Sequence, residues 1–187
     1  MKLTHLLLLP ALLVASVETP FEISPSQAQV SFTLGDVLHT VHGTFALKHG
    51  NLRFDPETGK AGGEIVVDAA SGQSGSAGRD KRMHANILES ARYPEIAFHP
   101  DRVEGKVAAD GPSDVKLHGI FSIHGGEHEL TVPTHVDAVG GHYTATAHFV
   151  VPYVQWGMKN PSTFVLRVSD KVDIDVHLVA QAATASQ

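Results

Sequence analysis

Apolar and polar residues alternate along most of this chain. Between Asp114 and Ile123 the apolar residues fall on one parity and the polar residues on the other, with Ile120 as the exception. Side chains alternate faces along a β-strand, so this segment predicts a strand with one dry face and one wet face. The same period of two recurs in most segments between turn sequences. The pattern predicts strands that enclose a single apolar interior.

Turn signals divide this pattern into roughly eight or nine antiparallel strands. We expect them at 22–34, 40–47, 63–69, 95–99, 115–124, 127–137, 142–151, 164–168 and 172–179, with Leu52 and Phe54 also facing inward. The segment from Arg79 to Ser90 differs, because Met83 and Ile87 have the i,i+4 spacing of a helix stripe. Tyr93-Pro94 ends this helix, since the residue before proline avoids the α region.

The strands are joined by recognisable turns. Gly125-Gly126 predicts a two-residue hairpin, and Gly140-Gly141 leads into the strand that follows. A long antiparallel sheet usually closes, because closure removes edges that are prone to aggregation. The fold class is therefore all-β: an antiparallel barrel of about eight strands with one short α-helix. A barrel of this size has room for one small ligand.

The two ends of the chain differ from the rest. Lys2 precedes an apolar run from Leu6 to Ala15, which is too short for a membrane-spanning helix and is typical of a secretory signal. An uncleaved membrane anchor is the alternative. We expect a signal peptide at 1–18, a barrel domain at 19–180 and a disordered tail at 181–187. The location is then periplasmic or secreted, in a chain without cysteine and so without disulfides.

The charge of the chain limits its partners. The formal net charge is -6 and there is no basic run, which argues against a nucleic-acid partner and against electrostatic docking to anionic lipid. We expect no stable membrane span once the signal is removed. The sequence leaves open whether the protein forms a homodimer.

No motif predicts an enzyme. The sequence His124-Gly-Gly-Glu-His128 matches the H-x-x-E-H pattern of a metalloprotease class, but that chemistry needs a helix. Here the flanks alternate as strands, so a polar hairpin tip is the ordinary interpretation. No serine, histidine and acid set is recognisable. We assign no catalytic residue.

The histidine count suggests a second hypothesis. The chain has 13 histidines, of which His118 and His124 share one predicted strand and His142 and His148 share another. Imidazole is the commonest metal-binding side chain, so four that met across strands would favour a metal-binding or metal-buffering protein. Scattered surface histidines are the alternative. We assign no residue as a metal ligand.

Several dispersed motifs together resemble the YceI-like family. They are Thr40-Val-His-Gly-Thr-Phe45, the stretch from Gly50 to Asp55, Arg79-Asp80, Tyr93-Pro-Glu-Ile-Ala-Phe98, the strand from Leu117 to Ile123, and Val168-Ser-Asp-Lys-Val-Asp-Ile174. Arg-Asp at a helix start followed by Tyr-Pro-x-x-x-Phe is the most specific part. The resemblance covers residues 21–179, and the stretch from Leu117 to Gly126 departs from the usual pattern. The resemblance implies a periplasmic, lipocalin-like barrel that binds polyisoprenoids or related long-chain amphiphiles.

The hypothesis that follows is a carrier of a long-chain amphiphile, such as a polyisoprenoid, an isoprenoid quinone or a fatty-acid-like lipid. Burial contributes about 0.8 kcal/mol per methylene, so a long tail binds without directed polar contacts. No cofactor is expected beyond that lipid. The candidate lining residues are Phe32, Val41, Phe45, Phe54, Ile65, Phe98, Leu117, Phe121, Phe149 and Trp156. The head-group candidates are His39, Arg79 and Lys159. Parity alone does not separate a cavity lining from solid core.

Overall fold

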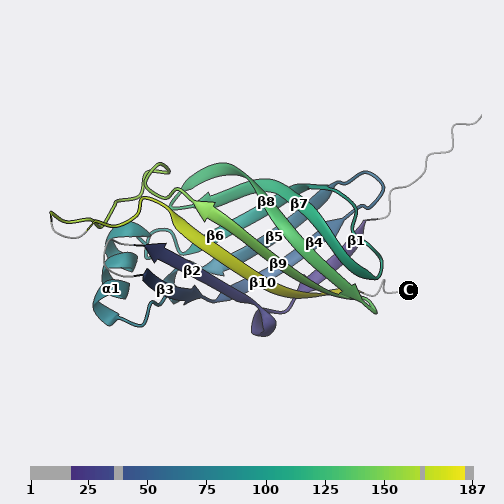
Figure 1. Cartoon of the computed structure of the whole chain (residues 1–187), viewed down its shortest axis with the longest axis horizontal. Helices are drawn as coiled ribbons and strands as arrows, with labels where there is room; N and C mark the ends of the chain where they lie inside the picture. Colours follow the sequence, from purple (N-terminus) through teal and green to yellow (C-terminus); the bar gives the residue numbers. More distant parts are fainter. Residues whose placement is uncertain (1–17, 36–39, 165–166, 184–187) are drawn as a thin grey trace, which may run out of the picture.

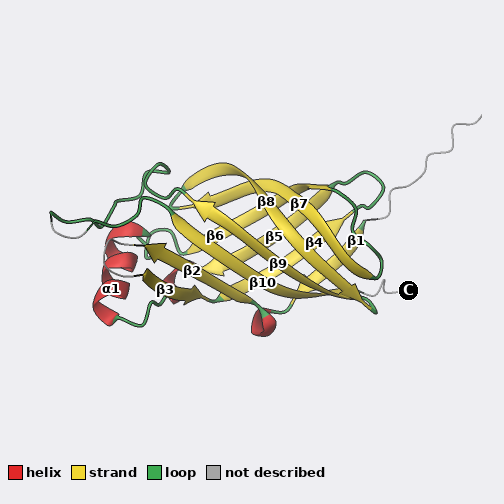
Figure 2. Cartoon of the chain, viewed as in Figure 1, coloured by secondary structure: helices red, strands yellow, loops and turns green. Residues whose placement is uncertain are grey.

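The computed structural model describes residues 18–35, 40–164 and 167–183, and it is built almost entirely from antiparallel strands (Figures 1 and 2). The strands are β1 Thr19–Ile23, β2 Gln29–Gly35, β3 Thr40–Phe45, β4 Leu47–Phe54, β5 Ala61–Asp68, β6 Glu95–Glu104, β7 Gly111–Ile123, β8 Gly126–Val139, β9 His142–Val151 and β10 Val172–Ala182.

These ten labelled strands form an eight-stranded closed barrel, because two of the eight are interrupted. β1 and β2 both pair with β10, on either side of a single 3-10 turn at Pro25–Gln27. β3 and β4 continue each other in the same way, since β3 pairs with β2 and β4 pairs with β1. The pairing of β1 with β10 closes the ring. The predicted antiparallel barrel of about eight strands with one short α-helix is confirmed.

Two-residue turns join the long strands. Ile123 pairs with Gly126, so the central residues of the first turn are His124 and Gly125, one position earlier than predicted. Both have positive φ, at 52° and 76°, as do the glycines 140 and 141 that join β8 to β9. Turns with two positive φ values match the right-handed twist of the strands that they connect.

The predicted helix is present and covers one end of the barrel (Figure 1). It consists of α1, Ala77–Arg82, and a π-helical turn η3, Met83–Ile87. The amide of Leu88 bonds to the carbonyl of Met83 at 2.9 Å, which closes the wider turn. Within the described residues, no helix is long and apolar enough to cross a membrane.

Two predicted boundaries are wrong. Residues 164, 167 and 168 belong to the connection between β9 and β10, so none of the described residues of the strand expected at 164–168 lies in a named strand. β10 also runs to Ala182, because Gln181 and Ala182 pair with Glu22 and Phe21 of β1. The expected signal peptide lies outside the described residues except for Glu18.

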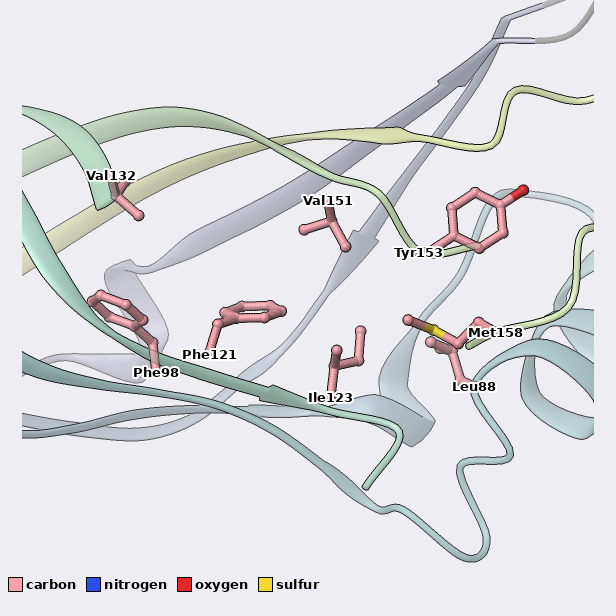
Figure 3. Packing of buried hydrophobic residues seen from close by; sticks show 8 residues of the cluster. All are labelled: Leu88, Phe98, Phe121, Ile123, Val132, Val151, Tyr153 and Met158. Carbon is pink, nitrogen blue, oxygen red and sulfur yellow. The ribbon is translucent and has the colours of Figure 1, made fainter. Parts of the chain in front are cut away.

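The interior has two apolar clusters. One is Leu88, Phe98, Phe121, Ile123, Val132, Val151, Tyr153 and Met158. In Figure 3, Leu88, Tyr153 and Met158 of this cluster converge beside the helix, while Phe98, Phe121 and Val132 lie on the strands. The second is Ile23, Val30, Leu47, Val67 and Leu178, from β1, β2, β4, β5 and β10. The clusters do not fill the barrel, and the space that remains is the candidate site.

Candidate ligand-binding cavity

A cavity of about 580 Å³ lies inside the barrel. Inward-facing side chains of every strand from β2 to β10 line it, and nearly all of them are apolar. Its size falls within the range of about 300 to 1,000 Å³ that is usual for small-molecule sites. The interior is therefore partly hollow.

Small residues on β9 contribute to this hollow. Ala145 and Ala147 occupy inward-facing positions of β9, and each places only a methyl group in the interior. Ala147 pairs with Thr134 of β8 and Val176 of β10, and both also line the cavity. The alternating pattern decides which face is inside, whereas the volume of the inward side chains decides how much space is left.

Eight of the ten candidate lining residues do line the cavity: Phe32, Val41, Phe45, Ile65, Phe98, Leu117, Phe121 and Phe149. Phe54 does not, because it is the last residue of β4, beyond the end of the cavity lining on that strand at Leu52. Trp156 does not either. Its indole stacks on the His128 imidazole, with ring centroids 4.0 Å apart, and lies 5.7 Å from the Phe121 ring.

The head-group candidates have three different outcomes. Arg79 lines the cavity, and its Nη1 donates to the carbonyl and the hydroxyl of Ser74 at 3.2 and 3.1 Å. Lys159 is exposed and is not part of the lining. His39 lies outside the described residues.

The polar lining that sequence reasoning missed is grouped beside Arg79. Ser74, Ser76 and Arg82 line the cavity there, and Arg79 and Arg82 are also exposed to solvent. The cavity therefore reaches the surface next to α1, and we call this opening the mouth. Arg82 stands three residues after Arg79, a helical spacing that could have suggested a shared side of the helix.

Side-chain hydrogen bonds attach α1 to the loop before it. The Asp80 carboxylate accepts from the amide and the hydroxyl of Ser74 at 2.8 and 2.5 Å. The hydroxyl bond from Ser74 is the main cause that holds the pKa of Asp80 below its ordinary value. His84 contacts the Gly72 carbonyl through Nε2 at 2.8 Å. These contacts hold Arg79 at the mouth.

The connection after β9 forms part of the wall at the mouth. Tyr153 and Met158 line the cavity, and neither was a candidate from the sequence. The Tyr153 hydroxyl donates to the Ser169 carbonyl at 2.6 Å. Burial, with a smaller contribution from Asp170, raises the pKa of Tyr153 to about 12, so the hydroxyl keeps its proton at neutral pH.

The described histidines are not gathered into a metal site. His118 contacts Asp101 at 2.7 Å, His148 contacts Asp175 at 2.8 Å, and His124 lies 3.8 Å from Glu89. His142 begins β9 at the turn after β8. The described part of the chain holds no group of three or more residues that could bind a metal ion. The four histidines that could have met across strands instead have separate surroundings, which gives the metal hypothesis no support among the described residues.

The barrel, the α1 cover and the apolar interior fit one family of proteins. The sequence model of the YceI-like domain matches residues 21–180. The chain belongs to the YceI-like family. This confirms the resemblance and its lipocalin-like barrel.

Solved structures of YceI-like proteins share the fold at low identity. BcnA of Burkholderia cenocepacia is 19% identical, with a TM-score of 0.70 over 87% of this chain and 99% of that one. A polyisoprenoid binding domain of Saccharophagus degradans, implicated in plant cell wall breakdown, is 13% identical with a TM-score of 0.70 over 87% and 98%. The Campylobacter jejuni YCEI protein is 13% identical, with a TM-score of 0.57 over 76% and 82%. No curated protein matches the chain.

Proposed function

We propose that this YceI-like protein binds one long-chain amphiphile, a polyisoprenoid or a lipid of similar shape, and carries or stores it without chemical change. The observation that supports this most strongly is the cavity of about 580 Å³, which is lined by apolar side chains and has both its arginines at the mouth. The Saccharophagus degradans relative is described as a polyisoprenoid binding domain, which supports the same class of ligand.

The energetics suit such a ligand. About ten buried methylenes contribute roughly 8 kcal/mol before the entropy lost on association is subtracted. The apolar wall supplies few directed contacts, so tail length and flexibility matter more than the pattern of polar groups. At the mouth, Arg79 and Arg82 supply guanidinium donors that suit an anionic or carbonyl head group.

The first experiment identifies what the protein holds. Protein purified without detergent is extracted with organic solvent, and the extract is analysed by mass spectrometry, with zinc measured in parallel. We expect a long-chain amphiphile in near-stoichiometric amount. An extract without any apolar molecule, together with stoichiometric zinc, would contradict the proposal and favour the metal hypothesis.

A matched pair of variants on β9 then tests the cavity. Ala147→Phe puts a large ring into the cavity, whereas Thr146→Phe puts the same ring on the exposed outer face one residue away. With cis-parinaric acid as the fluorescent probe, we expect the affinity of Ala147→Phe to fall by about tenfold or more, the equivalent of about 1.4 kcal/mol. Thr146→Phe should bind as the wild type does. Equal affinities in both variants would place the bound probe outside the barrel.

We also propose that the protein acts in the periplasm or outside the cell. The support is the apolar run from Leu6 to Ala15 that follows Lys2. N-terminal sequencing of the protein from a periplasmic fraction tests this. We expect a mature terminus close to residue 19, and an intact Met1 in the cytoplasmic fraction alone would contradict it.

A further inference from the structure

A fully exposed aromatic ring stands next to the mouth. Phe164 is 100% exposed, and only Val139 and Val150 join it as exposed large hydrophobic residues in the described part of the chain, at 68% and 41%. The connection that carries Phe164 extends past α1 at the left end of the molecule in Figure 1.

Hydrogen bonds hold the base of this loop together. The Val168 amide donates to the Ser162 hydroxyl at 2.8 Å, and Asn160 Nδ2 donates to the Val168 carbonyl at 3.3 Å. The Ser162 amide donates to Asn160 Oδ1 at 2.8 Å. Pro161 and Val168 also line the cavity. The loop therefore has its base in the cavity wall and presents Phe164 to the outside.

Two segments at the same end of the molecule carry an excess of positive charge. The segments 77–92 and 159–171 form what we call the mouth face, and their described residues include three acids and seven cations: Arg79, Lys81, Arg82, Arg92, Lys159, Arg167 and Lys171. All seven cations are exposed. This contrasts with the net charge of -6 for the whole chain.

The seven cations of the mouth face form no ion pair with any described residue, unlike three of the cations on the strands. Lys48, Arg53 and Arg102 form ion pairs with Glu95, Glu18 and Glu104. The three acids, Asp80, Glu89 and Asp170, offset part of this charge, and seven cations against three acids leave the described residues of the mouth face with a formal net charge of +4.

We propose that the mouth face docks on the surface of a bilayer that contains anionic phospholipid, with Phe164 inserted among the head groups. An aromatic ring favours the boundary between head groups and acyl chains, and each nearby Lys or Arg adds electrostatic attraction to anionic lipid. Docking in this orientation turns the opening of the cavity toward the bilayer. Transfer of an amphiphile in the docked state rests on the proposed function, whereas docking itself does not.

Vesicle flotation tests the proposal. Every described strand lies between Thr19 and Ala182, so a chain that begins at Glu18 keeps the barrel and removes the apolar N-terminal run, which would itself partition into lipid. We expect it to float with vesicles of phosphatidylcholine and phosphatidylglycerol in equal parts, and much less with phosphatidylcholine alone. Binding should fall as salt is raised, because salt screens exposed charges.

Two variants and a control identify the docking face. Phe164→Ser should lower the partition coefficient by about tenfold, an effect consistent with partial loss of the transfer energy of a Phe side chain. Lys159→Gln combined with Lys171→Gln should lower it on the anionic vesicles only. Val139 is the last residue of β8, at the end of the barrel away from the mouth. Val139→Ser therefore removes an exposed apolar residue outside the mouth face and should leave the partition coefficient unchanged.

The outcomes separate docking from ligand binding. Equal flotation of wild type and Phe164→Ser, or flotation that ignores phosphatidylglycerol and salt, would overturn the proposal and leave a protein partner as the explanation of the exposed ring. Phe164→Ser should still bind cis-parinaric acid added from solution. Loss of probe binding in Ala147→Phe with unchanged flotation would show that docking stands without the ligand.

Discussion

At the scale of single residues, the size of each inward side chain matters as much as its polarity. Gly72 is the clearest case, since it lies buried just before the helix, and a Cβ there would approach Phe45 Cε1 to 2.4 Å and Met83 Cε to 2.9 Å. Both neighbours line the cavity. Glycine at this position therefore lets the 71–76 loop pack directly on the wall of the cavity.

Gly72→Ala should destabilise the protein by about 1–3 kcal/mol, because Phe45 and Met83 must move into strained positions. Adding Phe45→Leu to Gly72→Ala should recover part of the lost stability, because it removes the ring that lies nearer to the new Cβ than Met83 does. Gly78 is the matched control, since a Cβ there meets nothing within 4 Å and the residue lies in α1. Gly78→Ala should stabilise by about 0.5–1 kcal/mol. Urea denaturation measures all three, and a neutral Gly72→Ala would contradict this account of the loop.

At the scale of elements, α1 depends on contacts outside itself. It has six residues, which is too short to be stable as an isolated helix, and its Ser76 N-cap makes no side-chain hydrogen bond. Asp80 and His84 instead bond to the preceding loop, at Ser74 and at the Gly72 carbonyl. The position of Arg79 and Arg82 at the mouth is therefore set by this pair of contacts.

The contact between Asp80 and Ser74 should weaken in acid. The pKa of Asp80 lies below its ordinary value of 3.8, so its stabilisation is fully present above that value and is lost as the pH falls through the lowered pKa. We expect the hydrogen-exchange protection of the Ser74 amide to persist at pH 4 and to decrease at lower pH. Asp80→Asn should show low protection at every pH. Full protection of Ser74 in this variant would show that the carboxylate charge is not what holds the loop.

At the scale of the whole molecule, the hollow interior couples ligand binding to stability. An apolar cavity leaves its lining side chains without partners on one side, which forfeits dispersion energy that a bound tail would supply. A ligand that binds only the folded barrel stabilises it by about 2.7 kcal/mol at a free concentration one hundred times its Kd.

Delipidated protein should therefore unfold at a lower temperature than protein loaded with cis-parinaric acid. The increase in Tm should grow with probe concentration in the wild type and in Thr146→Phe, and should be nearly absent in Ala147→Phe. Differential scanning calorimetry measures this. An equal increase in Ala147→Phe would contradict binding inside the barrel.

Much of this architecture follows from sequence alone, because the cause is local. Alternation on β9 and β10 predicted the inward residues correctly, since successive side chains on a strand must face opposite sides. Glycine pairs marked two turns, one of them displaced by a residue to His124-Gly125. The strand expected at 164–168 was misplaced, since Phe164 lies in the connection between β9 and β10 and is fully exposed.

Only the tertiary structure decided the features that concern function. Parity says which side of a strand a residue faces, but the space left inside depends on which side chains meet across the barrel, so Phe54 and Trp156 were misjudged while Tyr153 and Met158 were missed. The net charge of -6 argued against anionic lipid, yet folding brings the cations of segments 77–92 and 159–171 to one end of the barrel. Net charge is a sum over the chain and does not say where the charges lie, whereas the folded barrel fixes their positions.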